Sequence, residues 1–410
     1  MTAHGTLVRP DRAFVETLLA SGGGDLKRCF QCATCSVVCD LSNGRPFPRR
    51  EMLWAQWGLR DRLVADPSVW LCHQCNDCST RCPRGARPGD VLAAVRQQAI
   101  RHFAVPRLLA TWANGSATLP LVLLAPVLLI AGALLARDPL ARLLGTGPEH
   151  GLYAEFFPHW LLIGFFGLFT GLAAAAAVAG VARFWRAMRA ADEAEGRYVP
   201  ATGLGTSLLR VLGALATHDR FARCGAQGGR RWAHLAAFYG FLALYVVTIW
   251  AVIDLYVNPP LLGIASRYPF GLLHPMKLLA NVGGLLLVYG AARAILDRRR
   301  RLDGTPASTA FDWIFAWLLL AVGATGFAVE VLRFTVAPAQ EALAHGVYLV
   351  HLVVVFQLLV YLPYSKFAHL LYRTAAMVYV EHTARPLPAV VAEADDRPHP
   401  VGVVPPSPAA

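Results

Sequence analysis

The chain has 410 residues, of which 56% are hydrophobic and only 16% are charged. These proportions exclude an ordinary soluble globular protein and favour an integral membrane protein that carries a soluble part. A net charge of +12 would suit nucleic-acid binding. The arginines, however, cluster between long apolar runs, so membrane topology explains the charge and no nucleic-acid partner is expected.

The N-terminal part, residues 1–115, holds eight of the nine cysteines and no long apolar run. The first 25 residues lack the unbroken apolar core of a signal peptide. We therefore expect this part in the cytoplasm, where disulfides are rare and clustered cysteines are better explained as metal ligands. The sequence predicts a cytoplasmic ferredoxin-like domain over residues 1–115.

One cysteine spacing, Cys-x2-Cys-x2-Cys-x3-Cys, occurs twice in this domain. Zinc sites normally use two separated cysteine pairs, so zinc or a disulfide framework is the weaker alternative. In two-cluster ferredoxins the fourth cysteine of each motif binds the other cluster. The expected ligands are Cys29, Cys32, Cys35 and Cys82 for the first [4Fe–4S] cluster, and Cys72, Cys75, Cys78 and Cys39 for the second.

The segment between the motifs, residues 44–71, has apolar side chains at roughly helical spacing. We expect a core helix that packs against the clusters, with Trp70 as an alternative marker of a partner surface. The spaced residues are Met52, Trp54, Trp57, Leu59 and Leu63.

The rest of the chain contains six apolar runs long enough to span a bilayer, which takes about 20 residues. Together they predict a six-helix membrane domain over residues 116–375. A shorter apolar stretch, 204–215, is expected to lie on the cytoplasmic membrane surface. The proline-rich tail, 376–410, is expected to be disordered. The six runs are 118–136, 156–180, 234–256, 275–293, 311–332 and 345–364.

Basic residues between these runs predict the orientation in the membrane. Residues 183–231 contain nine arginines, and four consecutive arginines follow the fourth run at 298–301. The loops on the other side are poor in basic residues. The positive-inside rule then places both termini and the cysteine domain on the cytoplasmic side of the inner membrane.

Four histidines lie at membrane depth, where an ionisable side chain is costly and indicates function. By their predicted depth in the membrane, His234 and His369 form one pair near the cytoplasm, and His274 and His351 form a second pair near the outside. Each pair would supply neutral imidazole ligands to one haem b. His345 is an alternative to His274 as the partner of His351. A histidine at a helix end can also contact lipid headgroups without binding haem. His218 and Cys224, in the loop HDRFARCG, are assigned no role.

A quinone needs a hydrogen-bond partner and a proton route near a haem. Lys277 lies one turn after His274, so both should face the same way. With Asp254 it forms the candidate quinone site. The alternatives are that Lys277 extends to the membrane interface or forms an ion pair between helices.

The membrane subunit of the quinone-interacting membrane-bound oxidoreductase complex resembles this chain in the stretches CFQCATCSVVCDLSNGRPFPRREMLWAQWGLRDRL and WLCHQCNDCSTRCPRGARPGDVLAAVR. That membrane protein is itself similar to a fusion of the C and E subunits of heterodisulfide reductase. The likeness continues through HLAAFYGFLALYVVT and HPMKLLANVGG.

The final helix of the nitrate reductase gamma subunit resembles the stretch HLVVVFQLLVYLPYSKFAHLLY. There, two histidines eighteen residues apart bind two b haems, and His351 and His369 match them. His234 matches one partner histidine, whereas Leu244 stands where that family has the other. The resemblance therefore leaves the partner of His351 open.

The resemblance implies a mainly α protein: a helical two-[4Fe–4S] ferredoxin domain followed by a six-helix cytochrome b bundle. It also implies electron transfer between quinone and two flavin-containing, heterodisulfide-reductase-like soluble subunits, linked to adenylylsulfate reductase in sulfur metabolism. No classical catalytic residue is expected. One alternative is a membrane heterodisulfide reductase, which would need a further cysteine-rich motif. The other is a haem-free transporter or redox sensor, and a transporter would often show inverted repeats.

Overall fold

The computed structural model describes residues 9–42, 46–115, 117–147, 149–218, 230–266, 268–300 and 308–383. Within these ranges the secondary structure is helical and includes no strand. The predicted mainly α class is confirmed. Cys224 and the tail from residue 384 onward lie outside the described residues.

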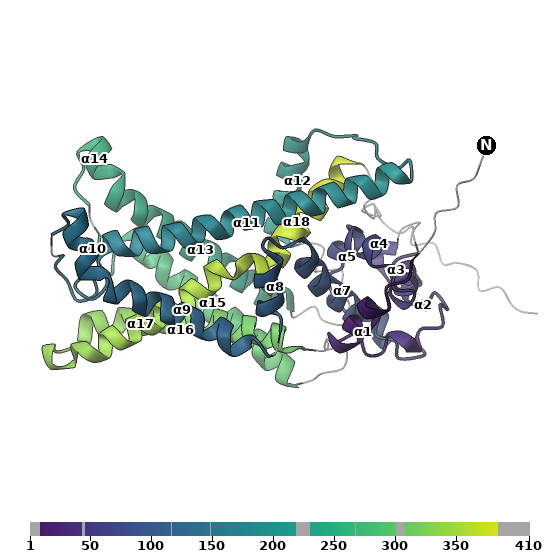
Figure 1. Cartoon of the computed structure of the whole chain (residues 1–410), viewed down its shortest axis with the longest axis horizontal. Coiled ribbons are helices and arrows are strands. Elements are labelled where there is room, and N and C mark those ends of the chain that lie inside the picture. Colours follow the sequence, from purple (N-terminus) through teal and green to yellow (C-terminus); the bar gives the residue numbers. More distant parts are fainter. Residues whose placement is uncertain are drawn as a thin grey trace, which may run out of the picture.

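Short helices gather at one end of an elongated molecule and long helices form a bundle that extends away from them (Figure 1). We call the short-helix end, residues 9–103, the head. Its elements are α1 (Arg12–Ala20), η1 (Leu26–Arg28), α2 (Thr34–Val37), η2 (Asp40–Ser42), α3 (Arg49–Gln56), α4 (Arg60–Val64), α5 (Ser68–Leu71), α6 (Asp77–Thr80) and α7 (Pro88–Phe103).

The predicted single helix over residues 44–71 is wrong in detail, because three short helices, α3, α4 and α5, fill this segment. Gly58 separates the first two: its φ is +65°, and a Cβ there would lie 2.5 Å from the Asp11 carbonyl oxygen. Met52 and Leu63 are fully buried, as expected of core residues. Trp57, by contrast, is 57% exposed and does not belong to the core.

Each of the six apolar runs becomes a helix. Among the described residues, five helices are long and apolar enough to cross a membrane, and α9 with α10 makes a sixth span if the pair, bent by 51°, is taken as one. The elements are α8 (Arg107–Ala113), α9 (Leu119–Leu135), α10 (Arg137–Leu144), α11 (His159–Ala194), α12 (Leu204–Thr217), α13 (Arg230–Tyr256), α14 (Asn258–Leu262), α15 (Pro275–Arg300), α16 (Ala310–Thr335), η4 (Pro338–Gln340), α17 (Glu341–Val360), η5 (Leu362–Tyr364), η6 (Lys366–Ala368) and α18 (His369–His382).

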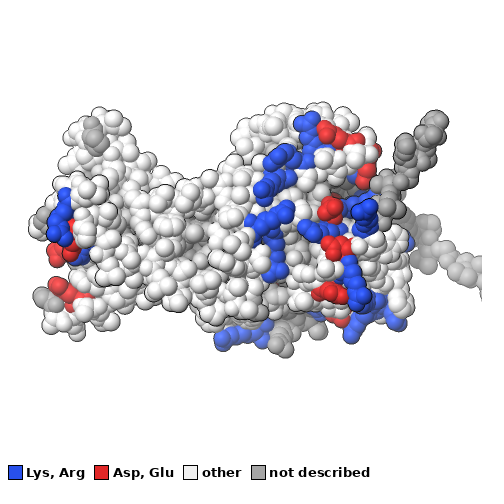
Figure 2. Space-filling view, in the orientation of Figure 1, with Lys and Arg blue, Asp and Glu red and all other residues white. Residues whose placement is uncertain are grey.

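Charged side chains are distributed unevenly between the head and the bundle. On the face shown in Figure 2, a broad belt without charges separates the charged head side from a small charged group at the far end of the bundle. The arrangement is compatible with a membrane protein whose apolar belt meets lipid.

Helices α13 and α15 pack closely through small residues. A Cβ at Gly240 would lie 2.5 Å from the Leu287 amide nitrogen, and one at Gly290 would lie 2.6 Å from the Ala233 carbonyl oxygen. Glycine is the residue that lets two membrane helices approach this closely. Because Ala233 precedes His234, this contact also fixes the turn of α13 that carries His234.

The stretch from His351 to His369, which resembles a single final helix, is not one continuous helix in this structure. Helix α17 ends at Val360, and two single turns, η5 and η6, precede α18. Pro363 has no amide proton to continue the helix, and Ser365 adopts an extended backbone with φ −100° and ψ −177°. His369 therefore begins a new helix, α18, instead of ending the sixth span.

Helix α18 lies between the head and the bundle (Figure 1). Its Tyr372 ring stacks on Trp70 of the head at 5.3 Å between centroids and contacts Phe184 of α11 at 5.6 Å. Trp70 is only 1% exposed. It is therefore part of the internal contact between head and bundle and not an outer partner surface.

Candidate functional site

The two cysteine loops have the same backbone path. The second and fourth residues after each first cysteine adopt left-handed φ angles: 60° at Gln31 and 69° at Ala33, then 54° at Gln74 and 66° at Asn76. None of these is glycine, so the conformation is unusual and occurs twice at matching positions. Each loop leads into a one-turn helix, α2 or α6. The Gln74 amide donates to the Cys72 sulfur at 3.3 Å.

The electrostatic neighbours of the thiols cross between the two loops. Burial raises the pKa of Cys29, and the nearby charges of Cys82 and Cys32 raise it further. Burial also raises the pKa of Cys39 to about 12, with Cys72 and Cys75 adding to it. These are the neighbours that the crossed ligand sets predict. The two sets themselves remain predictions.

The spacing of these thiols also bears on the metal. No disulfide involves any of the eight motif cysteines, which all lie in the described residues. Within the described ranges, no three His, Cys, Asp or Glu side chains stand close enough to hold a single metal ion. A cube of four irons is wider than one ion, so its thiolates lie further apart than those of a zinc site. The repeated spacing Cys-x2-Cys-x2-Cys-x3-Cys on two matching loops fits two [4Fe–4S] clusters.

The two loops differ in exposure. Cys32 is exposed, whereas Cys75, which has the same place in the second motif, is partly buried. Beside the first motif, Phe30 and Val37 are 66% and 85% exposed. The first loop therefore faces outward.

Two arginines of the bundle bind the second cysteine loop. Arg373 of α18 donates to the carbonyls of Cys72 at 3.1 Å and Leu71 at 3.3 Å, and to Nδ1 of His73 at 2.8 Å. Arg230 of α13 donates to the Gln74 carbonyl at 2.8 Å.

The same two helices carry the inner histidines. Arg230 precedes His234 by about one helical turn, and Arg373 follows His369 by about one turn. The head's second cysteine loop is thus fastened to both helices close to this histidine pair.

His234 and His369 come together as depth predicts. Their ring centroids are 6.4 Å apart and their planes are nearly perpendicular at 77°. Two imidazoles bound on opposite sides of one iron through bonds of about 2 Å place their centroids roughly 6 Å apart. In both rings Nδ1 contacts protein: His369 donates to the Lys366 carbonyl at 2.8 Å, and His234 lies 2.9 Å from Nε2 of His218. The pair fits the two axial ligands of one haem through Nε2.

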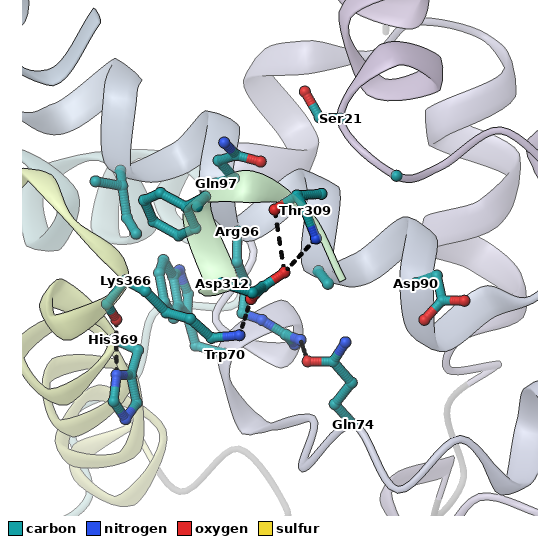
Figure 3. Close-up of a pocket in the computed structure, with 14 residues that line it drawn as sticks. Ser21, Trp70, Gln74, Asp90, Arg96, Gln97, Thr309, Asp312, Lys366 and His369 are labelled. Carbon is teal, nitrogen blue, oxygen red and sulfur yellow. Dashed lines mark hydrogen bonds and ion pairs between the residues drawn. The ribbon is translucent and has the colours of Figure 1, made fainter. Parts of the chain in front are cut away.

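A small pocket of about 50 Å³ lies next to this pair, where α7, the start of α16 and η6 meet (Figure 3). Its wall includes His369, the ion pair between Lys366 and Asp312, and Arg96, which donates to the Gln74 side chain at 3.0 Å. The volume holds a few water molecules and is too small for a quinone ring. The pocket therefore lies in the contact between head and bundle, with both polar and apolar side chains in its wall.

The outer histidines contact other groups. His351 lies 2.9 Å from the Thr325 hydroxyl, and a Cβ at Gly326 would lie 3.3 Å from its ring. His274 stacks on Phe270 at 4.4 Å. The alternative partner, His345, donates to the Leu152 carbonyl at 2.7 Å. The outer haem pair stays a prediction.

The candidate quinone residues have separate partners. Lys277 forms a 2.8 Å ion pair with Glu330 of α16, and Asn281 donates to the same carboxylate at 3.1 Å. Asp254 accepts from the Ser266 hydroxyl at 2.7 Å. The pairing of Lys277 with Glu330 is the ion pair between helices that the sequence left open as an alternative.

His218 is the residue that sequence reasoning missed. It is buried behind His234. Burial lowers its pKa, and the carbonyls of Leu215 and Ala216 partly oppose that shift. No periodic pattern links a histidine at the end of α12 to one near the start of α13, so its sequence position gives no signal.

Comparison with known proteins gives separate matches for the head and the bundle. Residues 25–86 match the family model described as a 4Fe-4S dicluster domain. The C subunit of the H(2):CoB-CoM heterodisulfide,ferredoxin reductase of Methanothermobacter thermautotrophicus is 37% identical over 92 residues, which cover 22% of this chain and 50% of that protein. The heterodisulfide reductase C-subunit-like protein of Archaeoglobus profundus is 32% identical over 100 residues, 24% of this chain and 53% of that protein. The chain thus spans about half the length of these relatives.

The bundle matches a second family model, described as citrate utilization protein B, over residues 113–388. The citrate utilization protein B of Escherichia coli is 29% identical over 319 residues, which cover 75% of this chain and 80% of that protein. No solved structure matches. The head is an iron–sulfur domain like the C subunits of heterodisulfide reductases, which supports an electron-transfer role, and the chain as a whole belongs to the citrate utilization protein B family.

Proposed function

We propose that this protein is the membrane electron-transfer subunit of a quinone-linked oxidoreductase. Electrons pass between a soluble flavin-containing partner and membrane quinone through two [4Fe–4S] clusters and b haem. The observation that carries the proposal is the attachment of the second cysteine loop, by Arg230 and Arg373, to the two helices that present His234 and His369.

The exposure of the two loops supports an order for the electron path. The first cysteine set includes the exposed Cys32, so it is the side that a soluble partner reaches. The second set adjoins α18 and the inner histidine pair. His234 and His369 would hold the haem, which would supply one-electron chemistry when bound, and the two arginines keep the second loop beside them.

Quinone chemistry is proposed at the other end of the bundle. Lys277, held by Glu330, supplies a proton donor at membrane depth, and Asp254 lies in the neighbouring helix α13 as the second candidate. His351 and His274 are the proposed ligands of an outer haem that connects the two ends. The proposed domain limits follow the sequence: a ferredoxin-like domain over residues 1–115, a membrane domain over 116–375 and a tail over 376–410, whose first residues, up to His382, complete α18. Both termini lie in the cytoplasm.

Two kinds of soluble partner are open to test. The resemblance to the quinone-interacting oxidoreductase favours two flavin-containing, heterodisulfide-reductase-like subunits and adenylylsulfate reductase. The name citrate utilization protein B, carried over from the Escherichia coli relative, favours a partner that acts in citrate utilisation. Anaerobic purification of the chain from its native membranes, followed by identification of the co-purifying subunits by mass spectrometry, separates the two.

The function is tested by reducing the purified full chain anaerobically and mixing it with a short-chain quinone. We expect quinone to reoxidise the clusters and haem of the wild type. His369→Ala should lose the inner haem, keep both cluster signals and reoxidise its clusters at least tenfold more slowly. His150→Ala, an exposed histidine at the far end of the bundle, is the matched control.

Three results would contradict the proposal. A full haem complement in His369→Ala would show that the ligand is wrong. A wild-type chain without haem would favour the haem-free transporter or sensor. Reduction of a heterodisulfide by the chain alone would favour the membrane heterodisulfide reductase.

A further inference from the structure

His218 stands directly behind His234, outside both cysteine motifs and the four predicted haem ligands. It caps the end of α12 with a left-handed φ of 53° and is 8% exposed. Its Nε2 lies 2.9 Å from Nδ1 of His234, and the ring centroids are 4.9 Å apart. Phe238, one turn after His234, contacts the His218 ring at 5.2 Å. The ring is therefore held in place by α12 and α13 together.

The protons of this arrangement can be assigned from chemistry. Two ring nitrogens 2.9 Å apart share one proton. A histidine that binds iron through Nε2 carries its proton on Nδ1, so His234 donates and Nε2 of His218 accepts. Neutral His218 then carries its own proton on Nδ1, on the side of its ring away from His234.

We propose that His218 is a positioning residue for His234: by accepting the Nδ1 proton it fixes the tautomer and the ring plane with which His234 presents Nε2 to a haem iron. The inference rests on the proposed function, since it assumes that His234 is a haem ligand. A hydrogen-bond acceptor on Nδ1 also makes the ligand more basic. A more basic ligand favours oxidised iron, so His218 lowers the reduction potential of the inner haem.

The opposite ligand has a different kind of partner. His369 donates to a main-chain carbonyl, that of Lys366, which no side-chain substitution removes. His218, by contrast, is a side-chain partner, so a substitution at this position can change the hydrogen bonding of the histidine pair. The ring planes of His234 and His369 are nearly perpendicular, at 77°. Two imidazole ligands in this arrangement would give oxidised haem iron a highly anisotropic low-spin signal in electron paramagnetic resonance. That signal would report any rotation of the His234 ring.

The test compares His218→Leu, which removes the acceptor, with His218→Gln, whose carboxamide oxygen can still accept. His150→Leu, an exposed histidine at the far end of the bundle, is the matched control. Haem per chain, the midpoint potential and the electron paramagnetic resonance spectrum of the oxidised full chain are measured. We expect His218→Leu to raise the potential, to change the anisotropic signal and to weaken haem binding about ten- to a hundred-fold. His218→Gln should stay close to wild type.

Each outcome decides the matter. A leucine variant with the wild-type potential and signal would overturn the inference while leaving the proposed function intact. If the leucine variant does not accumulate, the glutamine variant decides: a wild-type potential supports the acceptor role, and a raised potential refutes it. Absence of haem from the wild type and the His150→Leu control would refute the proposed function itself, and the inference with it.

Discussion

Replacement of Arg373 by methionine tests the joint between the head and the bundle. Methionine has a similar length and keeps the apolar contacts, but it donates no hydrogen bond. The substitution removes the bonds to the carbonyls of Cys72 and Leu71 and to His73. The second cysteine loop would then be held to the membrane helices by Arg230 and by the packing of α5 on α18.

The size of the effect follows from the three bonds. A hydrogen bond from a charged donor contributes about 1.5–3 kcal/mol, and the contributions of one side chain are not additive. Because the site is half buried, water replaces part of the loss, and we expect about 3 kcal/mol. A free energy of this size corresponds to roughly a hundred-fold increase in the population with a detached loop.

The assay is the rate at which haem is reduced after rapid, anaerobic reduction of the clusters. Arg373→Met should slow this step, while non-haem iron and haem per chain stay at wild-type values. Arg373→Lys keeps the charge and one reachable carbonyl, so it should be intermediate. Arg12→Met, on an arginine that is exposed in α1, is the control. An unchanged rate in Arg373→Met, with full cofactor content, would refute the role of the joint in electron transfer.

Three further predictions concern the head and the bundle. Cys39→Ala should abolish the second cluster's resonance and spare the first; loss of the first alone would reject the crossed ligands. Glu51 is buried, and burial followed by the charge of Asp66 raises its pKa to about 8 despite the neighbouring Arg50. Its stabilising contribution is therefore complete below pH 4.5, the value expected for the unfolded chain, and lost as pH rises through about 8. Glu51→Gln should therefore become progressively more stable than the wild type as pH rises through that range, seen as a growing difference in the temperature at which cluster absorbance is lost. A pH-independent difference would contradict it. Gly290→Leu should separate α13 from α15 and reduce haem content and thermal stability, whereas Gly132→Leu, which has open space around its Cβ, should not.

The parts of the fold that the sequence predicts are those set by local chemistry. The two cysteine loops can be predicted from spacing alone, because a tight loop around an iron–sulfur cube requires its cysteines to lie within about ten residues of one another. The long helices can be predicted because a helix that crosses a bilayer needs about 20 apolar residues. The closeness of His234 and His369 can be predicted from depth, since the expected topology places both on its cytoplasmic side.

The remainder depends on neighbours that are distant in sequence. The break after α17 was missed because Pro363 lies in an otherwise apolar run, and prolines are tolerated within membrane helices. Trp70 packs against Tyr372 and Phe184, which lie far along the chain in α18 and α11. His218 meets His234 only because α12 returns to the start of α13. None of these contacts has a sequence period that could reveal it.

The central claim is that His234 and His369 hold a haem beside the second cluster. It is tested most directly by a reduced-minus-oxidised visible spectrum of the anaerobically purified full chain, with haem and non-haem iron counted per chain in the wild type and in His369→Ala. The account predicts about eight non-haem irons in both proteins, for two [4Fe–4S] clusters, and one haem b fewer in the variant than in the wild type. A wild-type chain without haem, or a variant with the same haem content as the wild type, would contradict it.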